Sequence, residues 1–239
     1  MSQAQVFAVA IDDAIDDGVL AAVIAAAPAP RREAIGRLRA PDDIRRSVLG
    51  DALVRGLAAD RFGVAAGSLR CADGPHGKPV LSGHAGFEFN VSHSGRFVLA
   101  GVADDPIGVD VQRIDARRDL AAVLALARTA FAPEEQRALA AAGEPRLFYR
   151  LWTLRESYLK YVGTGLTMPR DAFWFTSEAP GWVLHLADGA SVPETMRPRF
   201  VTIDLDPDHP AAVCTVADRV APVRRLRATD VLSRVISVV

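Results

Sequence analysis

The sequence has few cysteines, almost no net charge and no long apolar run, and each absence excludes some classes of protein. Its two cysteines, Cys71 and Cys214, lie far apart and form no CxxC pair. Such spacing gives neither a disulfide framework nor a zinc site, and two free thiols fit a reducing cytosol. A net charge of −1 provides no overall attraction to nucleic acid or to a membrane surface.

No segment has the character of a membrane span or of a signal peptide. The longest apolar stretch, around 19–30, is rich in alanine, is interrupted by proline and is too short to cross a bilayer. The first 17 residues contain two Asp-Asp pairs and no basic segment. We therefore expect a cytoplasmic protein.

Common catalytic and nucleotide-binding motifs are also absent. The chain contains neither G-x-x-x-x-G-K-[ST] nor G-x-G-x-x-G, the signatures of P-loop and Rossmann nucleotide binding. Ser92, His93 and Asp110 suggest a serine hydrolase at first sight. However, adjacent residues of an extended segment point to opposite faces, so Ser92 would not readily reach His93. Since the G-x-S-x-G elbow is missing as well, we expect no hydrolase.

The first half of the chain has the pattern of a mixed α and β structure. Half of all residues are hydrophobic and 24% are charged, the balance of an ordinary globular protein. We expect a strand at 6–11, helices at 19–27 and 31–38, and a longer helix from Pro41 in which apolar residues recur at helical spacing. A loop rich in turn residues follows at 73–79.

Three strand-like segments come next, at 87–92, 96–103 and 107–114, separated by short turns that contain glycine or proline. Turns of this kind join neighbouring strands, so we predict a three-stranded antiparallel meander. The second turn also divides the chain into parts of similar size. We place the boundary between two domains there, giving 1–105 and 106–239.

The second half continues with helices and then with strands. A helical pattern covers 120–142 and is broken near Pro133, and 146–162 form one amphipathic helix. Four later segments predict a second antiparallel sheet: 173–175, 182–186, 200–205 and 212–217. The tail from Val223 is expected to be a short helix or an arm. The fold class is therefore α+β, built from two halves.

Acidic side chains from two elements, together with one lysine, carry the clearest chemical signal. Along 107–112 apolar residues alternate with Gly108, Asp110 and Gln112, which share one face of the strand. Glu156 and Lys160 lie one turn apart on the long helix and project from the same side. Paired carboxylates suit a hard cation such as Mg²⁺, which often also binds phosphate.

Each of these residues has a simpler interpretation. Glu156 and Lys160 would form an exposed helix salt bridge worth about 0.3–0.5 kcal/mol. Asp110 would be a charge that protects an edge strand. However, Asp110 lies in an otherwise apolar run, where an unpaired carboxylate is costly to desolvate. A metal ion or a cationic partner would remove that cost, so the combination favours a shared site.

Several motifs together resemble the Sfp-type 4′-phosphopantetheinyl transferases. They occur in that family's order: RSVLGD at 46–51, GKP at 77–79, FNVSHSG at 89–95, IGVDV at 107–111 and WTLRESYLKYVGTGL at 152–166. The last motif is distinctive, and the complete set is more specific than any part of it. The resemblance implies two pseudo-symmetric α/β halves with antiparallel sheets and packed helices, an active site in the cleft between them, and a monomer.

The resemblance also implies the reaction. A serine of an apo acyl or peptidyl carrier protein attacks the β-phosphate of coenzyme A, takes the phosphopantetheine arm and releases 3′,5′-ADP. Asp110 and Glu156 would hold Mg²⁺, and Glu156 would activate the serine. Lys160 would stabilise or protonate the leaving group. Many members carry a further acid at the position of Gln112, which would instead offer its carbonyl oxygen or a bridging water.

A further group is assigned by the resemblance to coenzyme A: Arg46, Gly77, Lys78, Pro79, Ser92, His93 and Lys160. Within it, Arg46 and His93 match residues that contact the 3′-phosphate, and Lys78 with its neighbours matches the loop around the adenine. Arg31 and Arg32 stand near the positions of earlier lysines of the family.

The resemblance places carrier docking on the segment after the metal strand. Carrier proteins are acidic around the modified serine, so the docking surface should be basic with an apolar centre. Arg113, Arg117 and Arg118 are the basic candidates, and Phe131 is an exposed apolar candidate. The same arginines also fit ordinary solvated charge.

Two other functions stay open on the sequence alone. A coenzyme A-binding or carrier-binding protein that has lost catalysis would keep most of these motifs, and Gln112 leaves room for it. An acetyltransferase that uses coenzyme A fits less well because it needs no metal-binding carboxylates. Sensitivity to EDTA would separate that second alternative from the transferase.

Overall fold

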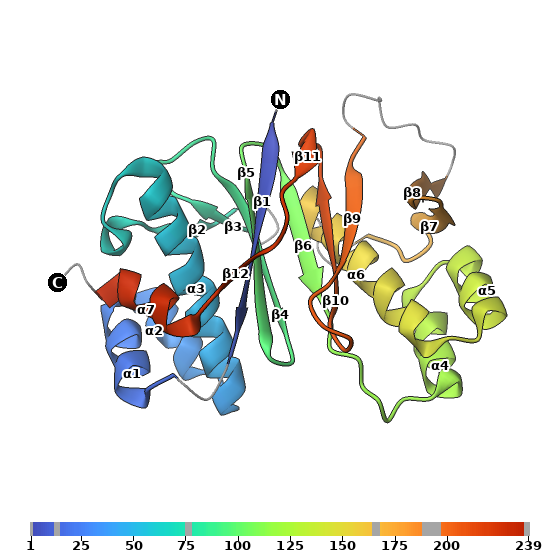
Figure 1. The fold of residues 1–239 in the computed structure, drawn as a ribbon, viewed down its shortest axis with the longest axis horizontal. Helices are drawn as coiled ribbons and strands as arrows, with labels where there is room; N and C mark the ends of the chain where they lie inside the picture. Colours follow the sequence, from blue (N-terminus) through green and yellow to red (C-terminus); the bar gives the residue numbers. More distant parts are fainter. Residues whose placement is uncertain (1, 12–14, 75–77, 164–167, 188–196, 237–239) are drawn as a thin grey trace.

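The computed structural model describes residues 2–11, 15–74, 78–163, 168–187 and 197–236. These residues form four layers, in which helices cover the outer face of a five-stranded sheet on one side and of a three-stranded sheet on the other (Figure 1). This arrangement confirms the predicted α+β class. Within the described residues no helix combines the length and the hydropathy needed to cross a bilayer.

In its described residues the first half contains three strands of the larger sheet, three helices and a short pair of strands. Its elements are β1 (Gln3–Ala10), α1 (Asp17–Ala26), α2 (Ala29–Gly36), α3 (Pro41–Phe62), the 3-10 turn η1 (Ala66–Ser68), β2 (Cys71–Asp73), β3 (Pro79–Leu81), β4 (Glu88–Ser94) and β5 (Phe97–Ala103). The helix predicted from Pro41 begins at that residue and ends at Gly63, whose positive φ closes it.

The described part of the second half contains five strands and three helices before the C-terminal segment begins. Its elements are β6 (Ile107–Val111), α4 (Leu120–Ala130), α5 (Pro133–Ala142), α6 (Pro145–Val162), β7 (Phe173–Glu178), β8 (Gly181–Leu186), β9 (Arg199–Asp204) and β10 (Pro210–Thr215). The predicted break near Pro133 is confirmed, since α4 ends before it and α5 begins at it.

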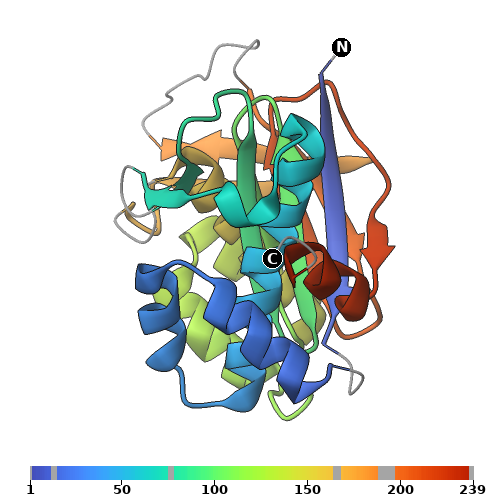
Figure 2. The same cartoon turned by 90° about the vertical axis from the view of Figure 1, so that its left-hand side faces the viewer.

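The C-terminal segment returns to the first half. Strands β11 (Arg219–Val220) and β12 (Arg224–Leu226) pair in parallel with β1, and α7 (Ala228–Ile236) packs against α1 and α3. Figure 2 shows α7 beside these helices, in front of the sheets. The short helix expected in the tail therefore forms part of the outer layer of the first half.

The prediction of a three-stranded meander is wrong at its third strand. Strands β4 and β5 pair antiparallel, but β6 pairs with β10 in the second sheet. The apolar faces of β5 and β6 instead pack against each other between the sheets. Gly101 makes this contact close, because a Cβ there would lie 2.6 Å from Val109 Cγ1. The turn at 104–106 thus carries the chain from one sheet to the other.

The second predicted sheet is likewise divided. Strands β7 and β8 pair only with each other, whereas β9 and β10 join β6 in the order β6-β10-β9. Strand β10 is buried on both faces, with Ala211 and Val213 in the core between the sheets and Ala212 and Cys214 in the core under α6. Burial on both faces explains why its sequence is apolar up to Cys214 and shows no alternation.

Candidate functional site

Strand β6 and helix α6 lie in direct backbone contact, and this contact builds the site. An alanine Cβ at Gly108 would lie 2.0 Å from the carbonyl oxygen of Ser157 and 2.5 Å from the amide nitrogen of Tyr161. Only glycine allows a helix to approach a strand so closely. Asp110, two residues further along the same face of β6, is thereby brought within reach of Lys160 on the same turn of α6.

The other edge of β6 is joined to β4 by side chains. The amide of Val109 donates to Asn90 Oδ1 (2.9 Å), that of Val111 to Ser92 Oγ (3.3 Å) and that of Arg113 to Ser94 Oγ (2.9 Å). This side-chain ladder, formed by Asn90, Ser92 and Ser94, satisfies backbone groups that would otherwise be orphaned. It fixes the register of the second half against the first.

The sequence analysis missed the role of Asn90 and Ser94. The signal was present, since polar residues occupy every second position of the segment FNVSHS and therefore share one face of a strand. It was interpreted only as part of a motif for coenzyme A. The lack of a backbone partner for β6 on this side, which gives the ladder its purpose, cannot be seen without the sheet order.

Asp110 is the centre of a buried polar cluster. Only 2% of its surface is exposed, and its Oδ1 accepts hydrogen bonds from Ser92 Oγ (2.7 Å) and from Lys160 Nζ (2.6 Å). Its Oδ2 accepts from Gln112 Nε2 (2.9 Å), so the predicted shared face is confirmed. Lys160 thus forms its ion pair with Asp110 and not with Glu156, which rules out the simple helix salt bridge.

Glu156 lies beside this cluster with a carboxylate that forms no hydrogen bond or ion pair to any described residue. Partial burial raises its pKa, and the charge of Asp110 raises it further, while Lys160 and Arg155 act in the opposite direction. The negative charge of Asp110 therefore acts on the carboxylate of Glu156. Two repelling carboxylates and one lysine would gain from a further cation between them.

The donor set fits Mg²⁺ with one adjustment. Among the described residues no three His, Cys, Asp or Glu side chains are grouped for a metal ion. The carboxylate oxygens available as ligands are those of Asp110 and Glu156. Mg²⁺ usually binds one or two carboxylates and completes its coordination shell with phosphate and water. Gln112 directs its amide nitrogen at Asp110, so its side chain would have to turn to contribute an oxygen.

A cavity of about 490 Å³ opens in the first half, between α2, α3 and the strands β2 to β4. Arg46, Pro79 and His93, which were predicted for coenzyme A, line it together with Arg31. Within it Arg31 donates to the carbonyl and hydroxyl oxygens of Ser47 (2.6 and 2.7 Å). The walls of the cavity are apolar in part and carry three arginines, Arg31, Arg46 and Arg55, which suits a phosphorylated nucleotide.

His93 connects this cavity with the acidic cluster. Its side chain is exposed while that of Ser92 is buried, as the alternation along β4 predicts. Partial desolvation lowers the pKa of His93, and the charges of Arg46 and Lys160 lower it further. The charge of Arg46, from the cavity, and that of Lys160, from the acidic cluster, thus both act on the imidazole of His93.

The predicted adenine loop is only partly placed. Gly77 lies outside the described residues. Lys78 does not line the cavity, because its Nζ donates to the carbonyl of Ile107 (3.2 Å) on β6, where burial lowers its pKa. Arg32, unlike Arg31, turns away and donates to the carbonyl of Ala27.

The apolar candidate for carrier docking is wrong. Phe131 is 1% exposed and stacks on Phe148 at 5.0 Å in the core of the second half, because it caps α4 where the chain turns inward. The basic candidates are on the surface, and Arg117 and Arg118 both pair with Asp115. A docking surface at this place would therefore be polar where an apolar centre was expected.

Arg155 supports the helix from its other side. It is buried next to Glu156, donates to Glu135 (2.7 Å) and to the carbonyls of Phe173 and Arg170, and lies 4.2 Å from the centre of the Phe173 ring. Glu135 in turn accepts from two backbone amides. A fully satisfied buried pair of this kind fixes one geometry, here the position of α6 against α5 and β7.

Comparison with known proteins agrees with this geometry. A family model described as the 4′-phosphopantetheinyl transferase superfamily matches residues 106–214, and one described as 4′-phosphopantetheinyl transferase, N-terminal, matches residues 17–104. The chain is 31% identical to the Bacillus subtilis 4′-phosphopantetheinyl transferase ffp over 78% of its own length and 80% of the relative. It is 30% identical to 4′-phosphopantetheinyl transferase Sfp of Bacillus subtilis strain 168, over 77% and 80%.

Proposed function

The chain belongs to the 4′-phosphopantetheinyl transferase superfamily, and from this we propose that it moves the 4′-phosphopantetheine arm of coenzyme A to a serine of an apo acyl or peptidyl carrier protein, releasing 3′,5′-ADP. One observation carries the proposal. Asp110 pairs with Lys160 and acts on the carboxylate of Glu156, which has no partner among the described residues, and the charge of Lys160 also acts on His93 in the wall of the cavity. A diphosphate with a nucleotide at one end would use both parts.

We assign the two halves, 1–105 and 106–239, to different tasks. The first binds coenzyme A, with Arg31 and Arg46 providing cationic groups for the 3′-phosphate end. His93 lines the same cavity as Arg46 and is affected by the charge of Lys160, so it would contact the part of the ligand between that end and the diphosphate. The second half provides the groups that act on the diphosphate itself.

Asp110 and Glu156 would hold Mg²⁺, with Gln112 or water beside them. When bound, the ion would neutralise charge on the diphosphate without moving a proton. Lys160, which already lies 2.6 Å from Asp110, would hold a phosphate oxygen of the leaving group. A serine hydroxyl is a weak nucleophile, and the carboxylate of Glu156 would accept its proton.

We expect mass spectrometry of an apo carrier incubated with the protein, coenzyme A and Mg²⁺ to show the added mass of one phosphopantetheine group. The reaction should stop with EDTA and resume with excess Mg²⁺, since the ion is proposed to neutralise the diphosphate. A carrier whose modified serine is replaced by alanine is the control. Binding of coenzyme A and carrier without a mass change would instead support a binding protein that has lost catalysis.

Gln112→Glu tests the metal site with less disturbance. A third carboxylate near Asp110 should tighten Mg²⁺ several-fold and keep activity, because it supplies a better oxygen ligand than an amide. Without the ion the same substitution should lower the thermal midpoint, since the hydrogen bond from Gln112 to Asp110 is replaced by repulsion. Mg²⁺ titration of activity and of the midpoint measures both. A folded variant without turnover would contradict a metal-facing position.

A further inference from the structure

The loop between β9 and β10 closes on itself around Asp206. The amide of Leu205 donates to the carbonyl of His209 (3.0 Å), and Asp206 Oδ1 accepts from the amide of Asp208 (2.9 Å) and from His209 Nδ1 (2.7 Å). Burial alone would raise the pKa of Asp206, but the hydrogen bonds from His209, Asp208 and Arg96 lower it to about 2. The ionised carboxylate therefore keeps the proton of the His209 ring on Nδ1.

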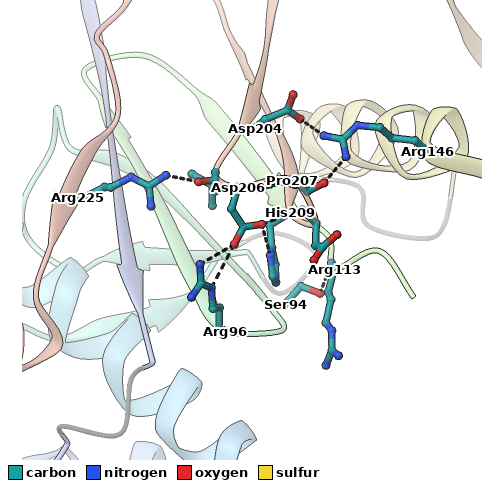
Figure 3. A network of polar contacts seen from close by, with 11 residues as sticks. Ser94, Arg96, Arg113, Arg146, Asp204, Asp206, Pro207, His209 and Arg225 are labelled. Carbon is teal, nitrogen blue, oxygen red and sulfur yellow. Dashed lines mark hydrogen bonds and ion pairs between the residues drawn. The ribbon is translucent and has the colours of Figure 1, made fainter. Parts of the chain in front are cut away.

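This loop of the second half is clasped to the turn between β4 and β5 of the first half (Figure 3). Arg96 donates to Asp206 Oδ2 through two nitrogens (2.8 and 3.2 Å), and the ring of His209 meets that of Phe97 edge-on at 5.0 Å. From the opposite side Arg146 of α6 donates to Asp204 (2.8 Å) and to the carbonyl of Pro207. The loop is thus held between α6 and the turn.

His209 ends against the backbone of Gly95. Its Nε2 is buried and has no hydrogen-bond partner among the described residues. A Cβ built on Gly95 would lie 2.4 Å from that nitrogen, and the φ of Gly95 is +54°. The imidazole therefore packs directly against the backbone of the turn. Only glycine fits at the tip of this turn, because its φ lies in the left-handed region and a side chain would meet the imidazole.

The carbonyl of Gly95 accepts a hydrogen bond from Arg46, one of the arginines that line the cavity. Arg46 NH1 donates to the oxygen of Gly95 (2.5 Å), and its NH2 donates to Asp43 (2.6 Å), one turn earlier on α3. If the turn moved, Arg46 would keep only Asp43, whose side chain is 46% exposed at the beginning of the helix. His93, which was also predicted to contact the 3′-phosphate, lies two residues before the same glycine.

We propose that His209 is a positioning residue for coenzyme A, which acts from the second half by pressing on Gly95 and thereby holding Arg46 at the rim of the cavity. This inference rests on the proposed function, because it takes coenzyme A as the ligand. It adds a group that neither touches the ligand nor lines the cavity. It also makes the affinity of the first half depend on a loop of the second.

The test is a set of dissociation constants measured by calorimetry. His209→Ala should raise the Kd of coenzyme A about tenfold, the size of effect that supporting networks commonly give. At saturating coenzyme A its kcat should stay within about twofold of the wild type, because the acids and Lys160 are untouched. Dephospho-coenzyme A, which lacks the 3′-phosphate, should bind both proteins equally.

Matched variants separate positioning from general loosening. Asp208→Ala removes a charge from the same loop, where that side chain makes no hydrogen bond or ion pair to a described residue, and should leave the Kd unchanged. His209→Asn keeps a donor for Asp206 but not the ring against Gly95, so it should match His209→Ala in Kd. It also serves as the test protein if the alanine variant folds poorly.

A double-mutant cycle with Arg46→Ala decides whether the effect passes through Arg46. If it does, His209→Ala should weaken coenzyme A no further in the Arg46→Ala background. Additive effects, an unchanged Kd in both His209 variants, or an equal loss for dephospho-coenzyme A would overturn the inference. A wild-type protein that does not bind coenzyme A would count against the proposed function instead.

Discussion

Glu156→Gln will lower kcat for phosphopantetheine transfer by about a thousandfold, within the range that a positioned general base contributes. The substitution keeps the shape of the side chain and removes only its negative charge. Both proposed tasks of Glu156, which are holding Mg²⁺ and accepting the proton of the serine, require that charge. The affinity for coenzyme A without metal should stay the same, because Glu156 does not line the cavity.

The structure makes this variant cleaner than a change at Asp110. Glu156 has no hydrogen bond or ion pair to a described residue, so glutamine leaves no partner unsatisfied. Asp110 instead anchors Lys160, Ser92 and Gln112, and its neutralisation would leave the ammonium group of Lys160 half-buried without its counter-ion. Loss of activity in Asp110→Asn would therefore mix chemistry with structure.

The control is the same substitution at the start of the same helix. Glu144 precedes α6 and makes no side-chain capping hydrogen bond, so Glu144→Gln should keep full activity and stability. Steady-state kinetics with a saturating apo carrier measure both variants. More than a tenth of wild-type kcat in Glu156→Gln would show that Glu156 is neither the base nor an essential metal ligand.

The sequence predicted the elements of the site better than their arrangement. The alternation along 107–112 and the one-turn spacing of Glu156 and Lys160 are local properties, and the structure brings Asp110 and Lys160 together as expected. The partner of β6 is not a local property. Short turns favour pairing with the preceding strand, but a second sheet with an apolar face offered β6 a better-buried position opposite β10.

The wrong prediction for Phe131 has a similar cause. Phe131 follows a helix at a proline-containing turn, where exposure and burial are equally consistent with the sequence, and only the packing of α4 against α6 decides. Lys78 was assigned by motif to the adenine end of coenzyme A, and in the structure its long side chain donates to the carbonyl of Ile107. The contacts of Asp206 and His209 with Arg96 and Gly95 join residues more than 100 positions apart, and no rule of sequence spacing predicts them.

Gly108→Ala will destabilise the protein by about 3 kcal/mol or more and remove transfer activity with it. The added Cβ would lie 2.0 Å from Ser157 O and 2.5 Å from Tyr161 N, which are backbone atoms of α6. No rotamer change relieves such a contact, so the helix and the strand must separate. Because Asp110 lies on this strand and Lys160 on this helix, the 2.6 Å ion pair between them must lengthen or break.

Gly36→Ala is the matched control, since a Cβ there meets nothing within 4 Å and the residue ends a helix without positive φ. It should be neutral or stabilise by about 0.4–1 kcal/mol through the unfolded chain. Urea denaturation and carrier mass spectrometry follow both variants, and a Gly108→Ala protein within 1 kcal/mol of wild type would contradict the close contact. In the Gly108→Ala molecules that remain folded, a displacement near 1 Å should still reduce transfer about a hundredfold. Glu156→Gln, by contrast, should lose activity at full stability, so the two variants together distinguish the chemistry of the acids from the contact that brings them together.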